Sequence, residues 1–259
     1  MTGSQQNRSS SSTALSTSAS RCGKKPCTYA DLQKMPADEL WELIDGVPHA
    51  MTVPSADHQF VSVQLTRQLA NFFHRSPCQV FHAPYGVFLP KKNESIEKTT
   101  NLVIPDLVVV CDEKKRTPQG CRGAPDLVIE ILSPSTAGRD RVKKLNLYER
   151  FGVKEFWIIS LDSAAVMVFR LDADGRYARP VQFYWSDKLT TPLFPALEVD
   201  LSEVFPKFVD TEDPETPDDS PPPSTPSDAP APRVREDAKP FAAPAKRRSG
   251  QRKSATKRR

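Results

Sequence analysis

Acidic side chains stand at the head of one strongly apolar run of the sequence and in the middle of another. Asp106 precedes Leu-Val-Val-Val in "IPDLVVV", and Glu130 interrupts the aliphatic residues of "APDLVIEILSPST". Alternate residues of a strand share a face, and a run that is apolar on both faces is typical of a covered central strand. An ionised carboxylate there costs several kcal/mol unless a partner, a metal or a proton neutralises it. We therefore expect Glu130 to have such a partner, with Asp106 beside it on the companion strand.

A lysine on the next predicted helix is the candidate partner of Glu130. The segment "GRDRVKKLNLYERFG" has a helical pattern that ends at a glycine, and successive helical residues are about 100° apart. Lys144 falls between Tyr148 and Phe151, inside the apolar arc of this helix, whereas the adjacent Lys143 falls on the polar side. We therefore predict that Lys144 faces the sheet and that Lys143 faces solvent.

Two acids and one inward lysine suit the metal-dependent hydrolysis of a phosphodiester bond. Mg²⁺ prefers oxygen ligands and keeps several waters, so the carboxylates of Asp106 and Glu130 are suitable ligands. The metal polarises the phosphoryl group and activates a bound water, and Lys144 can orient that water or stabilise charge on phosphorus. A competing interpretation is a structural ion pair between Glu130 and Lys144 with no metal.

The elements that must position these groups form a mixed pattern of helices and strands. The first predicted helix begins at the Thr28–Asp31 capping box, and Asp45-Gly46 is a turn signal. We expect a first helix within 28–44 that Pro36 ends or restarts, and further helices over 57–75 and 138–152. Strands are expected over 78–90, 104–110, 124–132, 155–161, 165–172 and 176–185. Asp174-Gly175 predicts a tight hairpin turn between the last two strands. The fold class is α/β, or α+β, with a mixed sheet around a helix crossover.

Composition divides the chain into three segments. Residues 1–24 are Ser/Thr-rich, and residues 210–259 form an acidic Pro-rich linker and a basic C-terminal tail, so we expect both to be disordered. Residues 25–209 remain as one globular domain. The chain has a net charge of +4, yet residues 26–209 carry 21 basic and 23 acidic side chains. The folded body is therefore no strongly basic nucleic-acid binder, and local patches or the tail must attract phosphate.

The remaining composition excludes several classes of protein. The five cysteines include no C-x-x-C pair and the four histidines have no zinc-finger spacing, so we expect no disulfide framework. No apolar run is long enough to span a membrane and no secretory signal is recognisable, which favours the reducing cytoplasm. G-x-S-x-G, Walker A and dinucleotide glycine motifs are absent from the sequence.

The motifs taken together resemble the Uma-two family, a bacterial domain described as a restriction endonuclease of the PD-(D/E)XK nuclease superfamily. The resemblance spans about Tyr29 to Pro206 and rests on "WELIDGVPHAM", the His58-Gln59 pair, "IPDLVVV", "APDLVIEILSPST" and "DRVKKLNLYERFGVKEFWII". It implies a restriction-endonuclease-like core, with a mixed central β-sheet flanked by helices.

The resemblance also implies roles for individual residues. Asp106 corresponds to the first metal-binding acid of the superfamily and Glu130 to the acid of its second motif, and Ile131 joins them in the metal site. The sequence departs from the plain superfamily pattern at Leu132, where a lysine is expected. The resemblance implies that Lys144, on the following helix, replaces that lysine.

Three further polar residues have alternative interpretations. Glu42 would be an additional catalytic acid near the metal, but on a predicted amphipathic helix it is equally a candidate for a solvated face. His58 is more typical of a hydrogen-bonded structural histidine than of a catalytic one. For Asp126 we favour a turn-to-strand junction, because Pro-Asp is common there.

Together these observations predict an Mg²⁺-dependent endonuclease that acts on DNA, with Mn²⁺ as a substitute cofactor. Double-strand cleavage would favour a homodimer, and the basic tail would serve as a non-specific nucleic-acid tether. The alternative is a catalytically inactive nucleic-acid-binding protein of the same fold, with a structural Glu130–Lys144 pair. A weaker alternative is an enzyme that acts on another phosphodiester or on a small molecule.

Overall fold

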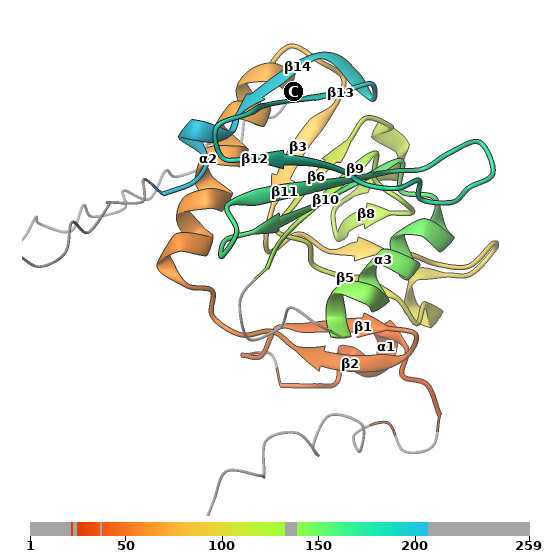
Figure 1. Cartoon of the computed structure of the whole chain (residues 1–259). Coiled ribbons are helices and arrows are strands. Elements are labelled where there is room, and N and C mark those ends of the chain that lie inside the picture. Colours follow the sequence, from red (N-terminus) through yellow and green to blue (C-terminus); the bar gives the residue numbers. More distant parts are fainter. Residues whose placement is uncertain (1–21, 23–24, 37, 133–138, 207–259) are drawn as a thin grey trace, which may run out of the picture. The chain divides into compact units, whose positions relative to one another are not determined.

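The computed structural model describes residues 22, 25–36, 38–132 and 139–206 (Figure 1). Of the terminal segments predicted to be disordered, 210–259 lies outside the described residues, as does 1–24 except for Cys22. Among the described residues, no helix has the length and apolar character needed to cross a membrane.

A mixed six-stranded sheet forms the centre of the fold. Its strands, in spatial order, are β12 (Val181–Tyr184), β11 (Ala165–Arg170), β10 (Glu155–Ser160), β9 (Leu127–Leu132), β6 (Leu107–Val110) and β3 (Gln79–His82). β9 and β10 run parallel and the other neighbours run antiparallel. Helix α3 (Arg139–Phe151) lies between β9 and β10 in sequence, as a parallel pair requires a crossover. The predicted mixed α+β architecture is therefore confirmed.

The two faces of β9 pack against different helices, as the alternation of its side chains predicts. Leu127 and Ile129 lie in one core cluster with Leu65 of helix α2 (Ala56–Phe73). Val128 lies in a second core cluster with Leu147 of α3. Glu130 shares the parity of Val128, so its side chain lies on the α3 side of the sheet.

Helix α2 buries one stripe of residues four positions apart. Val61, Leu65, Leu69 and Phe73 are buried, because residues at this spacing lie on one face of a helix. Phe60 and Phe72 are 43% and 39% exposed, because each lies one residue, or about 100°, away from the buried stripe.

The first predicted helix is much shorter than expected. The capping box is confirmed, but α1 covers only Tyr29–Leu32. Residues Trp41–Ile44 form strand β1, which pairs in a hairpin with β2 (Val47–Ala50) around Asp45 and Gly46. Both turn residues have positive φ, 49° and 77°, so the turn prediction is confirmed and the helix prediction is wrong. All four β1 residues are buried, which hides the period-two pattern of a strand.

Several elements outside the central sheet were not predicted individually, and the strand expected over 78–90 is divided between two sheets. A second sheet has the order β2, β1, β5 (Leu102–Val103), β4 (Val87–Phe88), β8 (Gly120–Arg122) and β7 (Arg116–Thr117), and β13 (Lys188–Thr191) pairs with β14 (Phe194–Asp200). Three 3₁₀ helices are η1 (Ile96–Lys98), η2 (Glu113–Lys115) and η3 (Leu201–Glu203). Strands of two or three residues are too short to show an alternation.

The expectation that the cysteines form no disulfides is wrong. Cys22 is bonded to Cys27, and Cys78 is bonded to Cys111. The second bond joins the neighbouring strands β3 and β6 just beyond their paired residues, so the pairing depends on strand register and not on sequence spacing. Cys121 is a free buried thiol, and burial raises its pKa to about 12.

The packing of α2 can be tested with a matched pair of substitutions. Leu65→Ala should lower the free energy of unfolding by about 2–5 kcal/mol, because Leu65 is fully buried and the variant leaves a cavity. Val63→Ala, at a site that is 59% exposed on the same helix, should change it by less than about 0.5 kcal/mol. Urea denaturation measures both; equal effects would contradict the described orientation of α2.

Candidate active site

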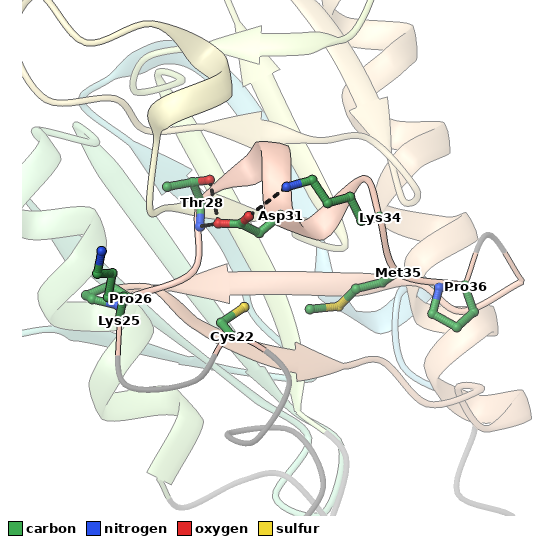
Figure 2. Close-up of a pocket in the computed structure, with 8 residues that line it drawn as sticks. All are labelled: Cys22, Lys25, Pro26, Thr28, Asp31, Lys34, Met35 and Pro36. Atoms are coloured by element: carbon green, nitrogen blue, oxygen red, sulfur yellow. Dashed lines mark hydrogen bonds and ion pairs between the residues drawn. The ribbon is translucent and has the colours of Figure 1, made fainter.

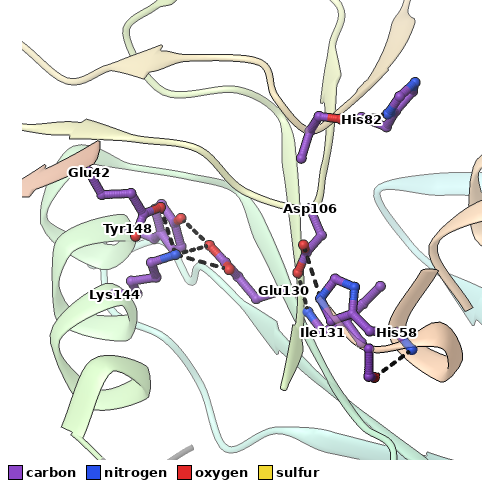
Figure 3. Close-up of polar contacts among 10 residues, drawn as sticks. Glu42, His58, His82, Asp106, Glu130, Ile131, Lys144 and Tyr148 are labelled. Atoms are coloured by element: carbon purple, nitrogen blue, oxygen red, sulfur yellow. Dashed lines mark hydrogen bonds and ion pairs between the residues drawn. The ribbon is translucent and has the colours of Figure 1, made fainter. Parts of the chain in front are cut away.

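Three elements bring an ion cluster together on the α3 side of the central sheet (Figure 3). Lys144 of α3 donates from Nζ to both carboxylate oxygens of Glu130 in β9, at 3.0 Å each. The same Nζ donates to Oε1 of Glu42 in β1 at 2.8 Å. One ammonium group therefore holds two carboxylates that are 88 positions apart in the sequence, Glu42 and Glu130.

Two further hydrogen bonds fix the carboxylates of this cluster. The Tyr148 hydroxyl donates to Oε1 of Glu130 at 2.7 Å, and the backbone N–H of Ile104 donates to Oε1 of Glu42 at 2.8 Å. Tyr148 is fully buried one helical turn after Lys144, so both side chains reach the sheet from one face of α3. Glu130 thus has three donated hydrogen bonds from α3.

Asp106 lies at the start of β6, beside the cluster. Leu107 pairs with Ile129 between antiparallel strands, so this register places Asp106 next to Glu130. Oδ2 of Asp106 accepts the backbone N–H of Ile131 at 2.7 Å, and Oδ1 lies 3.2 Å from Nε2 of His58 on α2. Asp106 therefore connects the α2 side of the sheet with the end of β9.

The position of Ile131 is compatible with its predicted place in the site. The N–H and C=O groups of one strand residue point to the same neighbouring strand, and the Ile131 N–H points to Asp106. Its carbonyl also contributes to the raised pKa of His58. The carbonyl oxygen of Ile131 and the carboxylate of Asp106 therefore face a common region, which His58 borders.

The charges of the cluster do not balance. Glu42, Asp106 and Glu130 are three acids, whereas within the described part of the chain the one permanent cation in contact with any of them is Lys144, which contacts Glu42 and Glu130. The pKa of Glu130 is raised to about 7, because burial and the carboxylates of Glu42 and Asp106 raise it and Lys144 only partly opposes them. A cation added beside Glu130 would therefore stabilise its ionised form.

The same excess of negative charge also raises the pKa values of the groups near Glu130. Burial alone would lower the pKa of Lys144, but Glu130 and Glu42 outweigh burial and raise it, so the ammonium stays charged. Burial and the charge of Glu130 raise the pKa of Tyr148 well above its usual value. Burial lowers the pKa of His58, but Asp106, Glu130 and the Ile131 carbonyl together outweigh burial and raise it.

The donor set fits a hard divalent cation such as Mg²⁺. Within the part of the chain that the structure describes, no three Asp, Glu, His or Cys side chains form a ready-made metal cluster. The two carboxylates of Asp106 and Glu130 and the carbonyl of Ile131 are all oxygen donors, and Mg²⁺ characteristically takes few protein ligands and keeps several waters. The uncompensated charge and the oxygen donors therefore fit this ion.

The positions predicted for individual side chains agree with the structure in some cases and differ in others. Lys144 faces the sheet and Lys143 is exposed, as predicted. The interpretation of Glu42 as a residue on a solvated helix face is wrong, because Glu42 is buried in a strand and contacts Lys144. Sequence reasoning placed Tyr148 in the apolar arc but assigned its hydroxyl no function. The shared helical face of Lys144 and Tyr148 was the signal that could have revealed it.

Asp126 does not belong to the cluster. One of its carboxylate oxygens accepts the backbone N–H of Cys111 at 2.8 Å, and the other pairs with Lys154 at 2.7 Å. These contacts hold the end of β6 to the start of β9, which is the junction role predicted for the Pro-Asp sequence.

A pocket of about 590 Å³ lies near α1, away from the ion cluster (Figure 2). Inside it the Asp31 carboxylate accepts hydrogen bonds from Thr28 and Lys34, which belong to the start and end of the α1 segment. None of the predicted site residues lines this pocket. The buried charged side chains, and not this cavity, therefore mark the candidate active site.

Comparisons with known proteins give a family and a fold. The family model Uma2, described as putative restriction endonuclease, matches residues 28–202. Two uncharacterized proteins of Synechocystis sp. are similar: slr1290 is 29% identical over 53% of this chain and 69% of its own length, and sll1609 is 28% identical over 43% and 60%. The crystal structure of a putative nuclease belonging to DUF820 from Anabaena variabilis aligns with a TM-score of 0.56 and 19% identity, over 70% of this chain and 98% of that chain.

The paired substitutions Lys144→Met and Lys143→Met test whether the ion cluster is buried. Lys144→Met should lower the free energy of unfolding by about 3–5 kcal/mol at pH 8, because it leaves two buried carboxylates without their cation. Lys143→Met should change it by less than about 0.5 kcal/mol. Urea denaturation in EDTA gives both values, and a Lys144→Met protein as stable as the wild type would contradict the described cluster.

The raised pKa of Glu130 predicts a pH-dependent stability. Its carboxyl has a pKa of about 7 in the folded protein against an ordinary value of 4.5, so the folded state binds the proton more tightly. The stabilisation that comes from this tighter proton binding by Glu130 is complete below about pH 4.5 and is lost as the pH rises through about 7. Relative to the wild type, Glu130→Gln should therefore be more stable at pH 8 than at pH 5. A difference that does not change with pH, in urea denaturation with EDTA, would refute this assignment.

Proposed function

The chain belongs to the Uma2 family of restriction-endonuclease-like proteins, and on this premise we propose that it is a Mg²⁺-dependent endonuclease acting on DNA. The observation that carries the proposal is the excess of buried negative charge where β6 and β9 lie side by side. Asp106 and Glu130 approach each other there beside one buried lysine, Lys144. A site that served only stability would be expected to balance its charges.

The residues of the cluster divide into metal ligands and supporting groups. Asp106, Glu130 and the carbonyl of Ile131 would hold the ion. Mg²⁺, when bound, polarises the phosphoryl oxygens and makes a bound water more acidic. Tyr148 and the Ile104 N–H keep the carboxylates of Glu130 and Glu42 in place through the hydrogen bonds at 2.7 and 2.8 Å.

Lys144 acts as a charged group and not as a base. Its pKa is raised by Glu130 and Glu42, so it carries a proton at neutral pH and cannot accept one from water. Its ammonium can instead stabilise the negative charge that develops on the phosphoryl oxygens, or orient the attacking water by donating to it. The hydrogen bond to Glu42 would keep Lys144 near the site when Glu130 binds the metal ion.

A second candidate function has one observation in its favour. Lys144 contacts both Glu130 and Glu42 directly, so these three side chains form an ion cluster that can stabilise the fold by itself. This contact supports the alternative of a nucleic-acid-binding protein without useful cleavage, in which the pair is structural. The two functions also differ in a property that does not depend on cleavage: only a metal site gains stability when Mg²⁺ or Mn²⁺ is added.

Plasmid cleavage tests the proposed function. The wild-type protein should nick or linearise supercoiled DNA in Mg²⁺, and in Mn²⁺ as a substitute, but not in EDTA. Asp106→Asn, Glu130→Gln and Lys144→Ala should each lower the cleavage rate by about 100-fold or more, since the first two weaken metal binding and the third removes the cation that faces the reacting phosphate. Far-ultraviolet circular dichroism of each variant shows whether it has folded.

The outcomes of this experiment separate the candidate functions. Metal-dependent cutting that is lost in all three variants supports the nuclease. No cutting of supercoiled, linear or single-stranded DNA, together with no thermal stabilisation by either metal, would favour the binding protein. Cutting that survives in the folded variants would contradict the roles given to these residues.

A further inference from the structure

A groove lined by both charged and apolar residues lies where α3 meets the β1–β2 hairpin. Its volume is about 290 Å³, and α3 contributes Lys143, Asn146 and Arg150 to its lining. The hairpin contributes Ile44, Asp45 and Val47, and the buried Leu147 of α3 forms part of the floor. The three polar α3 residues recur at intervals of three and four, so they form one continuous stripe on the exposed face of the helix.

The groove has an excess positive charge. Arg150 pairs with Asp45 at 2.6 Å, and both side chains are more than half exposed. Asp45 is the one acid among the described residues that line the groove, and Arg150 compensates it. Lys143 is exposed and has no ion-pair or hydrogen-bond partner among the described residues, so its ammonium is available to a ligand. The amide of Asn146 adds a neutral donor beside it.

The groove and the ion cluster are built on the same two elements. Lys143 and Lys144 are consecutive on α3, and about 100° of helix rotation directs one ammonium to the groove and the other to Glu130. On the hairpin, Glu42 reaches the cluster and Asp45 lines the groove. A rigid helix and a short hairpin therefore fix the groove relative to the candidate active site.

We propose that this groove binds a backbone phosphate of double-stranded DNA, with Lys143 as the charged donor and Asn146 as the neutral donor. The inference rests on the proposed nuclease function, because it takes DNA as the substrate. A DNA strand carries a phosphate at every nucleotide, so a strand that reaches the active site can place a second phosphate in a neighbouring groove. Such contacts set the position of the duplex and carry no sequence preference.

Charge complementarity is the argument for this ligand. The described domain has nearly balanced charge, so a nucleic acid needs a local excess of positive charge at which to bind. The groove provides this excess together with open access to solvent, whereas the buried Lys144 is already held by two carboxylates. Phosphate recognition by one lysine and one amide is also compatible with the small volume of the groove.

Binding without cleavage gives the direct test. The full-length protein is titrated into a fluorescein-labelled 20-base-pair duplex in EDTA, and anisotropy gives the dissociation constant at several salt concentrations. Lys143→Ala should weaken binding and lower the slope of log K against log salt concentration by about one, the value for one phosphate contact. Asp45→Asn should tighten binding, since it removes the acid of the groove, and asparagine tolerates the positive φ of this turn residue.

A matched control separates the groove from the general loss of charge. Lys92→Ala removes an exposed lysine from the turn before η1 and should leave the slope unchanged. The basic tail is present in every variant and contributes equally to all of them. The proposal is overturned if Lys143→Ala and Lys92→Ala have the same effect, if Asp45→Asn does not tighten binding, or if the wild type binds no DNA. Failure of the proposed nuclease would appear differently, as normal duplex binding with no cleavage in Mg²⁺.

Discussion

The structure depends on the placement of three carboxylates and one lysine, which contacts two of them, in a region with little access to water. The side chains of Lys144 and Glu130 are each only 13% exposed, so the charges are weakly screened and their imbalance has a cost. Lys144 offsets part of this cost, and the remainder appears in the raised pKa of Glu130. A protein selected only for stability would have little reason to retain the third acid, which makes the imbalance an indication of function.

Each part of the fold contributes to this placement. The antiparallel register of β6 and β9 brings Asp106 next to Glu130, and the helix between the parallel strands β9 and β10 carries Lys144 and Tyr148 to the same end of the sheet. The β1–β2 hairpin then adds Glu42 from a second sheet. The apolar packing of α2 and α3 on the two faces of the central sheet holds these elements rigidly, and this rigidity preorganises the charges.

Some of this arrangement could be predicted from the sequence because it depends on local periodicity. The alternation of β9 and the helical phase of α3 directed Glu130 and Lys144 toward each other correctly. Glu42 was misplaced because a four-residue strand that is buried on every side has no alternation to detect. The Cys78–Cys111 bond depends on the register of two separate strands. The hydrogen bond from the Tyr148 hydroxyl was missed because the apolar ring of Tyr148 already explained its place on the buried face of α3. In these cases the decisive contact is non-local.

The central claim is that the excess charge between Asp106 and Glu130 binds a divalent cation. A crystal of the protein soaked in Mn²⁺, with anomalous scattering measured for that metal, tests this claim most directly. We expect a single strong anomalous peak within bonding distance of carboxylate oxygens from both residues, with Lys144 displaced from Glu130 toward Glu42. A map without a peak at this position, in which Lys144 still contacts both oxygens of Glu130, would contradict the claim and leave the cluster as a structural ion pair.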